Sequence, residues 1–172
     1  ALTDRGLYVA YLVDIEGKTF IRIVDETGVD IYLKEGRDPV LRTDGEDLFL
    51  LYDTVKPNKI LQNLEFITLD GQLKKGHYEI EADDLNFSAD MRCHPGTGLL
   101  AMAWETAPVW GADPAVGYHR DIAYAEVYLN DECVEIRPEI VPVEKRAYNE
   151  LKKTIPRYPQ NAAPVNPIVI FD

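Results

Sequence analysis

Two of the three histidines of this 172-residue chain lie next to residues with which they could do chemistry. His94 follows Cys93, an order that suggests a nucleophile and its base. Neighbouring residues of an extended segment point to opposite sides, however, so these two side chains should diverge. Cys93 shares a face with the apolar Met91, where a thiol is unreactive. We therefore expect a structural role, and reduced thiols at both Cys93 and Cys133, because neither lies in a metal-binding or redox spacing.

His77, Glu79 and Glu81 alternate along a second segment with strand-like sequence. Residues two apart in a strand share one face, so these side chains form a row that could hold a hard cation. One histidine and two glutamates make only a weak, open site, and the solvent face of an edge strand explains the row equally well. We expect no metal and no other cofactor.

A glycine- and proline-containing loop over residues 107–120 is the best candidate for contact with a ligand or partner. Trp110, Tyr118 and His119 lie in this loop, and Asp121 follows it. Loops held by a rigid β scaffold often carry function, so these four residues are the predicted binding residues. The alternative interpretation is that Trp110 only caps one end of the β fold.

The chain contains no G-x-S-x-G or H-E-x-x-H motif and no phosphate-binding glycine fingerprint. His119-Arg120-Asp121 matches three letters of the protein-kinase catalytic loop, but the other kinase motifs are missing. The sequence therefore favours a protein that is not an enzyme.

The charge balance narrows the classes of partner. The chain has 30 acidic and 18 basic residues. The resulting net charge of −12 repels phosphate backbones and anionic membranes. We expect no nucleic-acid or membrane partner, and other protein chains instead. No apolar run is long enough to span a membrane, and no signal peptide is recognisable, so we expect a cytoplasmic protein or one assembled in a particle.

The fold should be organised around Leu99–Trp104, the most apolar run of the chain. Gly98 precedes this run and Pro108 follows it shortly after, which is typical of a strand buried on both faces. Trp104 is the largest side chain of this run and is expected in the core.

Strand patterns and turn residues cover most of the rest of residues 1–138. We predict a hairpin of 7–14 with 19–25 and then strands at 29–33, 48–55, 64–69, 76–82, 85–91 and 121–129, with 132–137 returning after an Asn130-Asp131 turn. Lys34–Pro39 should be a polar loop, with at most a brief pairing at Val40-Leu41. Between Leu85 and Met91, the odd-numbered residues should share the core face. The prediction is a mainly β, antiparallel sandwich or barrel.

The sequence changes character after residue 138. Apolar residues at spacing four predict one short helix over Val143–Ile155. Four prolines between Pro156 and Pro167 then favour an extended arm, which ends on Ile168, Val169, Ile170 and Phe171.

This C-terminal unit, residues 139–172, supports one of two hypotheses about function. An extended arm with an apolar end suits addition to a sheet edge of another chain. The first hypothesis is therefore a non-enzymatic structural or assembly subunit of a larger particle, for example a virion component. The second is a small-molecule or protein binding module, or a small enzyme, that uses the loop around Trp110 and Asp121. The arm has an alternative too, since its apolar tetrad could pair with its own domain.

Overall fold

The computed structural model describes residues 1–82, 84–94, 97–107, 121–129 and 136–141. Every regular element in this part of the chain is a β-strand, and all pairings but one are antiparallel. The prediction of a mainly β, antiparallel protein is therefore confirmed. The predicted helix over 143–155 and the arm lie outside the described residues, and the boundary near residue 138 stays a prediction.

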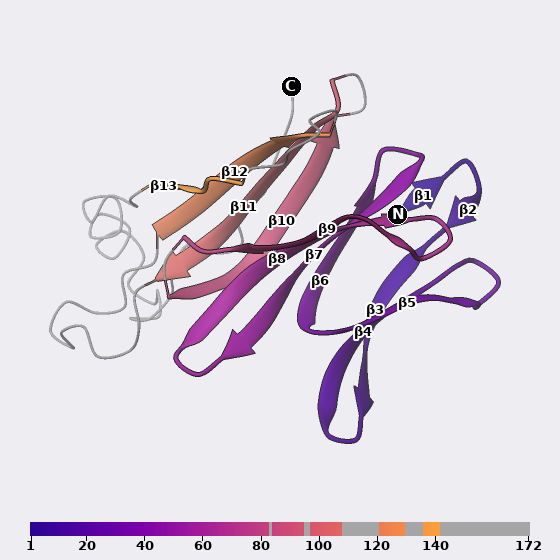
Figure 1. The fold of residues 1–172 in the computed structure, drawn as a ribbon, viewed down its shortest axis with the longest axis horizontal. Helices are drawn as coiled ribbons and strands as arrows, with labels where there is room; N and C mark the ends of the chain where they lie inside the picture. The colour runs from indigo at the N-terminus through magenta and orange to yellow at the C-terminus, as the bar shows by residue number, and fades with distance from the viewer. Residues whose placement is uncertain (83, 95–96, 108–120, 130–135, 142–172) are drawn as a thin grey trace, which may run out of the picture.

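The strands form one large sheet, one three-stranded sheet and one short pair (Figure 1). The large sheet runs in the order β13-β12-β11-β10-β8-β7-β6, with β9 also paired to β8. Its strands are β6 (Arg37–Thr43), β7 (Asp47–Lys56), β8 (Lys59–Thr68), β9 (Leu73–Ile80), β10 (Leu85–His94), β11 (Leu99–Ala107), β12 (Asp121–Tyr128) and β13 (Glu139–Val141). The small sheet has the order β3-β4-β5, with β3 (Val9–Ile15), β4 (Lys18–Val24) and β5 (Asp30–Glu35), and the pair consists of β1 (Leu2–Thr3) and β2 (Gly6–Leu7).

Two cores lie on opposite faces of β7 and β8. Strand β10 starts beside β8, where Leu85 pairs with Ile60, and farther along it reaches β6, where Arg42 Nε donates to the Met91 carbonyl at 2.8 Å. Strands β10 to β12 thus cover one face and enclose the first core, to which Phe49, Leu51, Leu64, Phe66, Met91, Met102 and Trp104 belong. The small sheet covers the other face and encloses the second core, to which Ile21, Ile23, Leu48, Leu50, Tyr52 and Ile67 belong.

The central position of Leu99–Trp104 is confirmed. This run lies in β11, between β10 and β12, and Trp104 is fully buried in the first core. The indole Nε1 donates to Asn86 Oδ1 at 2.8 Å, so the polar edge of the ring is satisfied inside the core. The predicted hairpin of 7–14 with 19–25 is also present as β3 and β4, and the strand predicted at 64–69 is the second half of β8.

The predicted polar loop over Lys34–Pro39 is wrong. Strand β5 continues to Glu35, and β6 begins at Arg37 and pairs with β7. The pairing is interrupted between Arg37 and Val40, where Asp38 has a positive φ of 50°. A bulge in an edge strand accommodates Pro39, which has no N–H to donate. Pairing with β7 therefore makes this segment a strand despite its polar sequence.

The predicted alternation along Leu85–Met91 is wrong as well. A bulge between Phe87 and Asp90, with a positive φ of 54° at Ser88, reverses the order of faces. Asn86 and Met91 are both fully buried, although residues five apart in a regular strand lie on opposite faces. The extra residue of the bulge is what turns both toward the core.

Strand β13 begins after the predicted returning segment 132–137, most of which lies outside the described residues. Strand β13 pairs with β12, placing Ile140 opposite Ala123. Of the predicted segment 132–137, only Ile136 and Arg137 are described, and they belong to no strand. The predicted Asn130-Asp131 turn lies outside the described residues.

Candidate functional site

A carboxylate without exposed surface, that of Glu65, lies in the middle of β8 between the large and small sheets. Its Oε1 is 2.8 Å from Lys34 Nζ and 3.0 Å from His77 Nδ1. It also accepts hydrogen bonds from two tyrosines, with Oε2 2.9 Å from the Tyr32 hydroxyl and Oε1 3.1 Å from the Tyr52 hydroxyl. We call these five residues the Glu65 cluster.

Four strands position this cluster. Tyr32 and Lys34 are two residues apart on β5 and share the face that covers the large sheet. Tyr52 comes from β7, and His77 is the register partner of Glu65 on β9. The chain at Gly36 passes so close that a Cβ there would lie 2.5 Å from Tyr52 Cδ2, so glycine permits the contact.

The electrostatics of the cluster favour an ionised Glu65. Burial raises the pKa of Glu65, but hydrogen bonds from Lys34 and Tyr32 outweigh it and leave the pKa below its ordinary value. Burial and the neighbouring Glu65 charge raise the pKa of Tyr52 far above its ordinary value, so its hydroxyl remains a donor. The Glu65 cluster therefore joins the two sheets by satisfied, charge-assisted hydrogen bonds.

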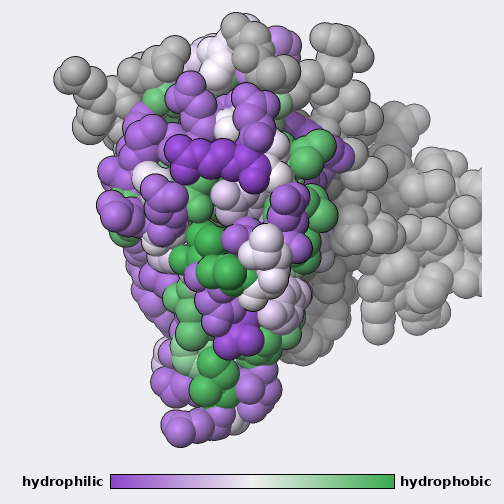
Figure 2. All heavy atoms as spheres, turned by 90° about the vertical axis from the view of Figure 1, so that its right-hand side faces the viewer, coloured by the Kyte–Doolittle hydropathy of each residue, from purple (hydrophilic) through white to green (hydrophobic). Residues whose placement is uncertain are grey.

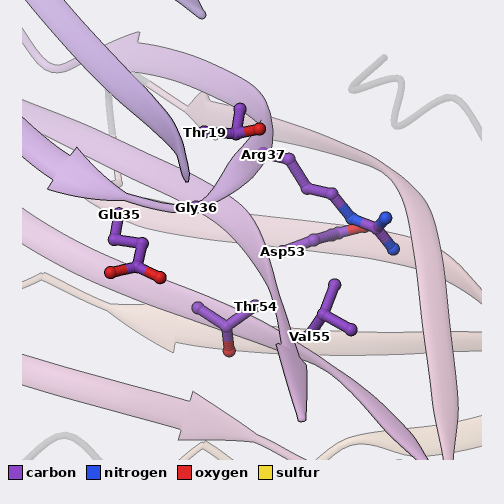
Figure 3. A pocket seen from close by; sticks show the side chains of 7 residues that line it. All are labelled: Thr19, Glu35, Gly36, Arg37, Asp53, Thr54 and Val55. Carbon is purple, nitrogen blue, oxygen red and sulfur yellow. The ribbon is translucent and has the colours of Figure 1, made fainter. Parts of the chain in front are cut away.

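A cavity of about 370 Å³ lies between the small sheet and β7, close to this cluster (Figure 3). Its lining residues come from β4, from the junction of β5 with β6, and from β7. They are Thr19, Glu35, Gly36, Arg37, Asp53, Thr54 and Val55. We call this the Asp53 cavity.

Asp53 is only 1% exposed, and its carboxylate is half satisfied. Gln62 Nε2 on β8 donates to Asp53 Oδ1 at 2.5 Å, whereas Oδ2 has no hydrogen-bond partner among the described residues. Arg37 is the register partner of Asp53, yet its Nε makes no hydrogen bond and lies 3.9 Å from Asp38 Oδ2. Burial, helped by the Asp38 charge, raises the pKa of Asp53 to about 7, although the Gln62 hydrogen bond and Arg37 act in the opposite direction.

The small sheet also presents an apolar surface to solvent. Residues that alternate with the buried Ile21 and Ile23 face outward, and we call their surface the outer face. It includes Val9, Tyr11, Val13, Ile15, Phe20 and Leu33, around a central Arg22. Figure 2 shows apolar side chains in a band down this side of the molecule, with hydrophilic ones beside them. Among the described residues, β3 forms a ladder with β4 alone, and it also lies against β6.

Among the four predicted binding residues, only Asp121 is described, and it begins β12 opposite Thr106. Trp110, Tyr118 and His119 lie outside the described residues, as do Ile168, Val169, Ile170 and Phe171. These sites stay predictions.

The row of His77, Glu79 and Glu81 is on β9 and at its end, but each side chain contacts a protein group. His77 contacts Glu65, while Glu79 is 2.7 Å from Lys56 Nζ and Glu81 is 2.9 Å from Lys59 Nζ. In the described ranges, no three His, Cys, Asp or Glu side chains gather as a metal site. Cys93 is partly buried against the first core, and burial raises its pKa, as expected for a structural thiol.

Asp53 and Glu65 were both missed by sequence reasoning. Each interrupts an apolar run, Asp53 after Leu50-Leu51-Tyr52 and Glu65 between Leu64 and Phe66. A charged residue inside a buried strand must be paired with another group or have a shifted pKa. An acidic residue within an apolar run was therefore the sequence feature that could have identified both residues.

Comparison with protein-family models, with curated proteins and with solved structures gave no match for the chain. Among the described residues, no helix has the length and apolar character to cross a membrane.

Proposed function

We propose that this chain is a non-enzymatic assembly subunit that binds further copies of itself in a larger particle, of which a virion is one example. The observation that carries the proposal is the edge strand β3, which has one ladder partner among the described residues and lies beside the apolar outer face. The C-terminal arm of a second copy is the proposed occupant of this edge.

The edge of β3 has the properties of a docking strand. An edge strand presents unpaired N–H and C=O groups that can pair with another chain, and proteins usually protect such edges with charge, proline or a bulge. On β3 the exposed side chains include Val9, Tyr11, Leu12 and Ile15, and its pairing with β4 shows no bulge. An arriving strand would therefore gain backbone hydrogen bonds and apolar contacts together.

The whole segment after residue 141, the predicted helix together with the arm, is opposite in charge to the rest of the chain. Residues 142–172 carry five basic and three acidic residues, a net charge of +2, whereas residues 1–141 carry 13 basic and 27 acidic residues, a net charge of −14. The segment is thus attracted to the rest of another copy. Within the arm, the four prolines from Pro156 to Pro167 favour extended conformations before the apolar Ile168–Phe171 end, which lowers the entropy lost on docking.

A pair of single substitutions tests the receiving edge. Leu12→Lys places a charge on β3, and we expect it to dissociate the assembly by blocking strand addition. Leu73→Lys on β9 is the matched control, since both leucines are 45% exposed and the change of charge is the same. Sedimentation velocity at several concentrations should give monomers for Leu12→Lys and wild-type assemblies for Leu73→Lys. Equal behaviour of the two variants would refute docking on β3.

A further inference from the structure

We propose that Asp53 holds a proton that it shares with Gln62, and that loss of this proton moves Arg37 from Asp38 to the Asp53 carboxylate. This conformational switch is built into the fold and does not depend on assembly. The proposal rests on three buried polar atoms that make no hydrogen bond in the described structure. They belong to Arg37, Asp53 and Gln62, which form one row across β6, β7 and β8.

The three residues of this row are direct neighbours across the large sheet. Arg37 is the register partner of Asp53, and Asp53 is the register partner of Gln62. Partners in an antiparallel ladder present their side chains to the same face. Leu51 and Leu64, two residues from Asp53 and Gln62 along their strands, belong to the first core, so the row faces that core. The side chains of Arg37 and Asp53 run in the same direction in Figure 3.

The hydrogen bond between Gln62 and Asp53 leaves two acceptors without a donor. Gln62 Nε2 donates to Asp53 Oδ1 at 2.5 Å, while Asp53 Oδ2 and Gln62 Oε1 are buried and have no partner. An ionised carboxylate can only accept, whereas a protonated carboxyl has one O–H donor. A proton on Oδ2 therefore completes a pair in which acid and amide each donate once and accept once, and it removes the cost of two unsatisfied buried oxygens.

Two charged groups on β6 act on Asp53 in opposite directions. Burial is the main cause that raises the pKa of Asp53 to about 7, and the Asp38 charge acts in the same direction. The Gln62 hydrogen bond and the Arg37 charge oppose this rise without cancelling it. Asp53 therefore gains and loses its proton close to neutral pH.

The other strands near the row bring uncharged groups or groups that are already paired. Strand β9 places the apolar Ile80 opposite Gln62, and β10 contributes the amide of Asn86, which donates to the β8 backbone. Glu35 of β5 lines the cavity between the small sheet and β7, and it is paired with Lys18 at 3.2 Å. Arg37 is therefore the cation placed to respond to Asp53.

Arg37 can take over when the proton leaves. Its Nε is buried without a hydrogen bond, and its ion pair in the described structure is a long contact of 3.9 Å with Asp38 Oδ2. When the Asp53 O–H bond breaks, the proton passes to solvent water and the electron pair stays on Oδ2. The buried carboxylate then attracts the guanidinium more strongly than the exposed Asp38 does, because charges interact more strongly away from water. The exchange acts on the bulge of β6, where Asp38 has its positive φ.

Solid-state magnetic resonance of the isotopically labelled full chain tests the switch, and it applies to a monomer and an assembly alike. Between pH 5 and pH 9, the carboxyl carbon of Asp53 should change from the shift of a neutral acid to that of a carboxylate, with a midpoint of about 7. The side-chain amide of Gln62 and the Nε–H of Arg37 should follow with the same midpoint, because both change their hydrogen bonds in the same step.

Asp53→Asn is the matched mimic of the neutral acid. An asparagine amide can donate to Gln62 Oε1 and accept from Gln62 Nε2, as the protonated acid does, but it has no proton to lose in this range. The Gln62 and Arg37 signals of the variant should therefore stay at their wild-type pH 5 positions up to pH 9. Glu79→Gln removes a carboxylate from the exposed pair with Lys56 on β9 and should leave the three wild-type curves unchanged.

Four results would overturn the proposal. An Asp53 carbon that is already ionised at pH 5, or a Gln62 amide that does not follow the Asp53 curve, would contradict the shared proton. An Arg37 signal that is constant through the Asp53 midpoint, or that moves equally in Asp53→Asn, would contradict the transfer of Arg37. If Asp53→Asn fails to fold, the wild-type curves of Gln62 and Arg37 decide.

Discussion

Asp53 and Glu65 are buried carboxylates on neighbouring strands, and their surroundings give them opposite properties. Glu65 has four hydrogen-bonding partners, among them Lys34, and its pKa lies below the ordinary value. Asp53 has Gln62 alone, and burial raises its pKa to about 7. The number and charge of partners, more than the depth of burial, decide whether each carboxylate stabilises the fold.

The raised pKa of Asp53 predicts a pH-dependent effect of Asp53→Asn on stability. Between its unfolded pKa, near 4, and about pH 7, the folded state holds a proton that the unfolded state releases, so stability falls as the pH rises through this window. Above pH 7 the ionised Asp53 is a net cost that asparagine does not carry. Urea unfolding should therefore show Asp53→Asn more stable than wild type at pH 8, by on the order of 1–3 kcal/mol, and closer to wild type at pH 5. The difference in unfolding free energy between Asp53→Asn and wild type should therefore become more favourable to the variant from pH 5 to pH 8. A change in the other direction would contradict the raised pKa of Asp53.

Glu65→Gln should have the opposite effect. It removes the anion from between Lys34 and His77 and leaves charged or polar groups without their partner, a loss of about 3–5 kcal/mol for a buried pair. Because the pKa of Glu65 is lowered, its contribution is present at neutral pH and is lost as the pH falls through the folded-state pKa. Thermal melting at pH 7 measures the loss. Glu79→Gln, in an exposed ion pair, is the control and should change stability by about 1 kcal/mol or less.

At the scale of elements, local patterns predicted the strands well where turn residues and alternation agreed. Glu16-Gly17 and the apolar residues beside it were enough for the β3–β4 hairpin. Strand β6 was missed because its sequence is polar and contains Pro39, and only pairing with β7 makes it a strand. The bulge at Ser88 was missed because no local residue type requires it.

The site could not be predicted for a related reason. Alternation assigns residues to faces, but it does not say which strands become neighbours. The contact of His77 with Glu65 depends on the register of β9 on β8, and that of Lys34 depends on the packing of the small sheet. The row of His77, Glu79 and Glu81 was therefore predicted correctly as neighbours along β9 and at its end, but Glu65, the buried partner of His77, was not predicted.

Trp104 tests the role of β11 as the central element. Trp104→Ala removes a fully buried indole together with its hydrogen bond to Asn86 Oδ1, so we expect a loss of about 3–5 kcal/mol. Urea unfolding followed by circular dichroism measures it. Stability within about 0.5 kcal/mol of wild type would show that the core does not depend on this strand.

At the scale of the whole molecule, charge is unevenly distributed along the chain. The net charge of −14 over residues 1–141 opposes close packing of their copies, whereas the +2 segment that follows offers an attractive contact. Assembly through the segment of residues 142–172, helix and arm together, would therefore join two negatively charged bodies by a positively charged connection. It should weaken with added salt, to the extent that exposed charges contribute.

Deletion of residues 157–172 tests the central claim most directly, through the molar mass measured by light scattering after size exclusion. We expect the full chain to form a multimer and the shortened chain to be a monomer whose melting temperature is unchanged. The removed residues would then have been bound to another copy and not to their own β-strands. A full chain that is monomeric at every concentration, or a shortened chain that remains monomeric but melts far below wild type, would contradict the claim.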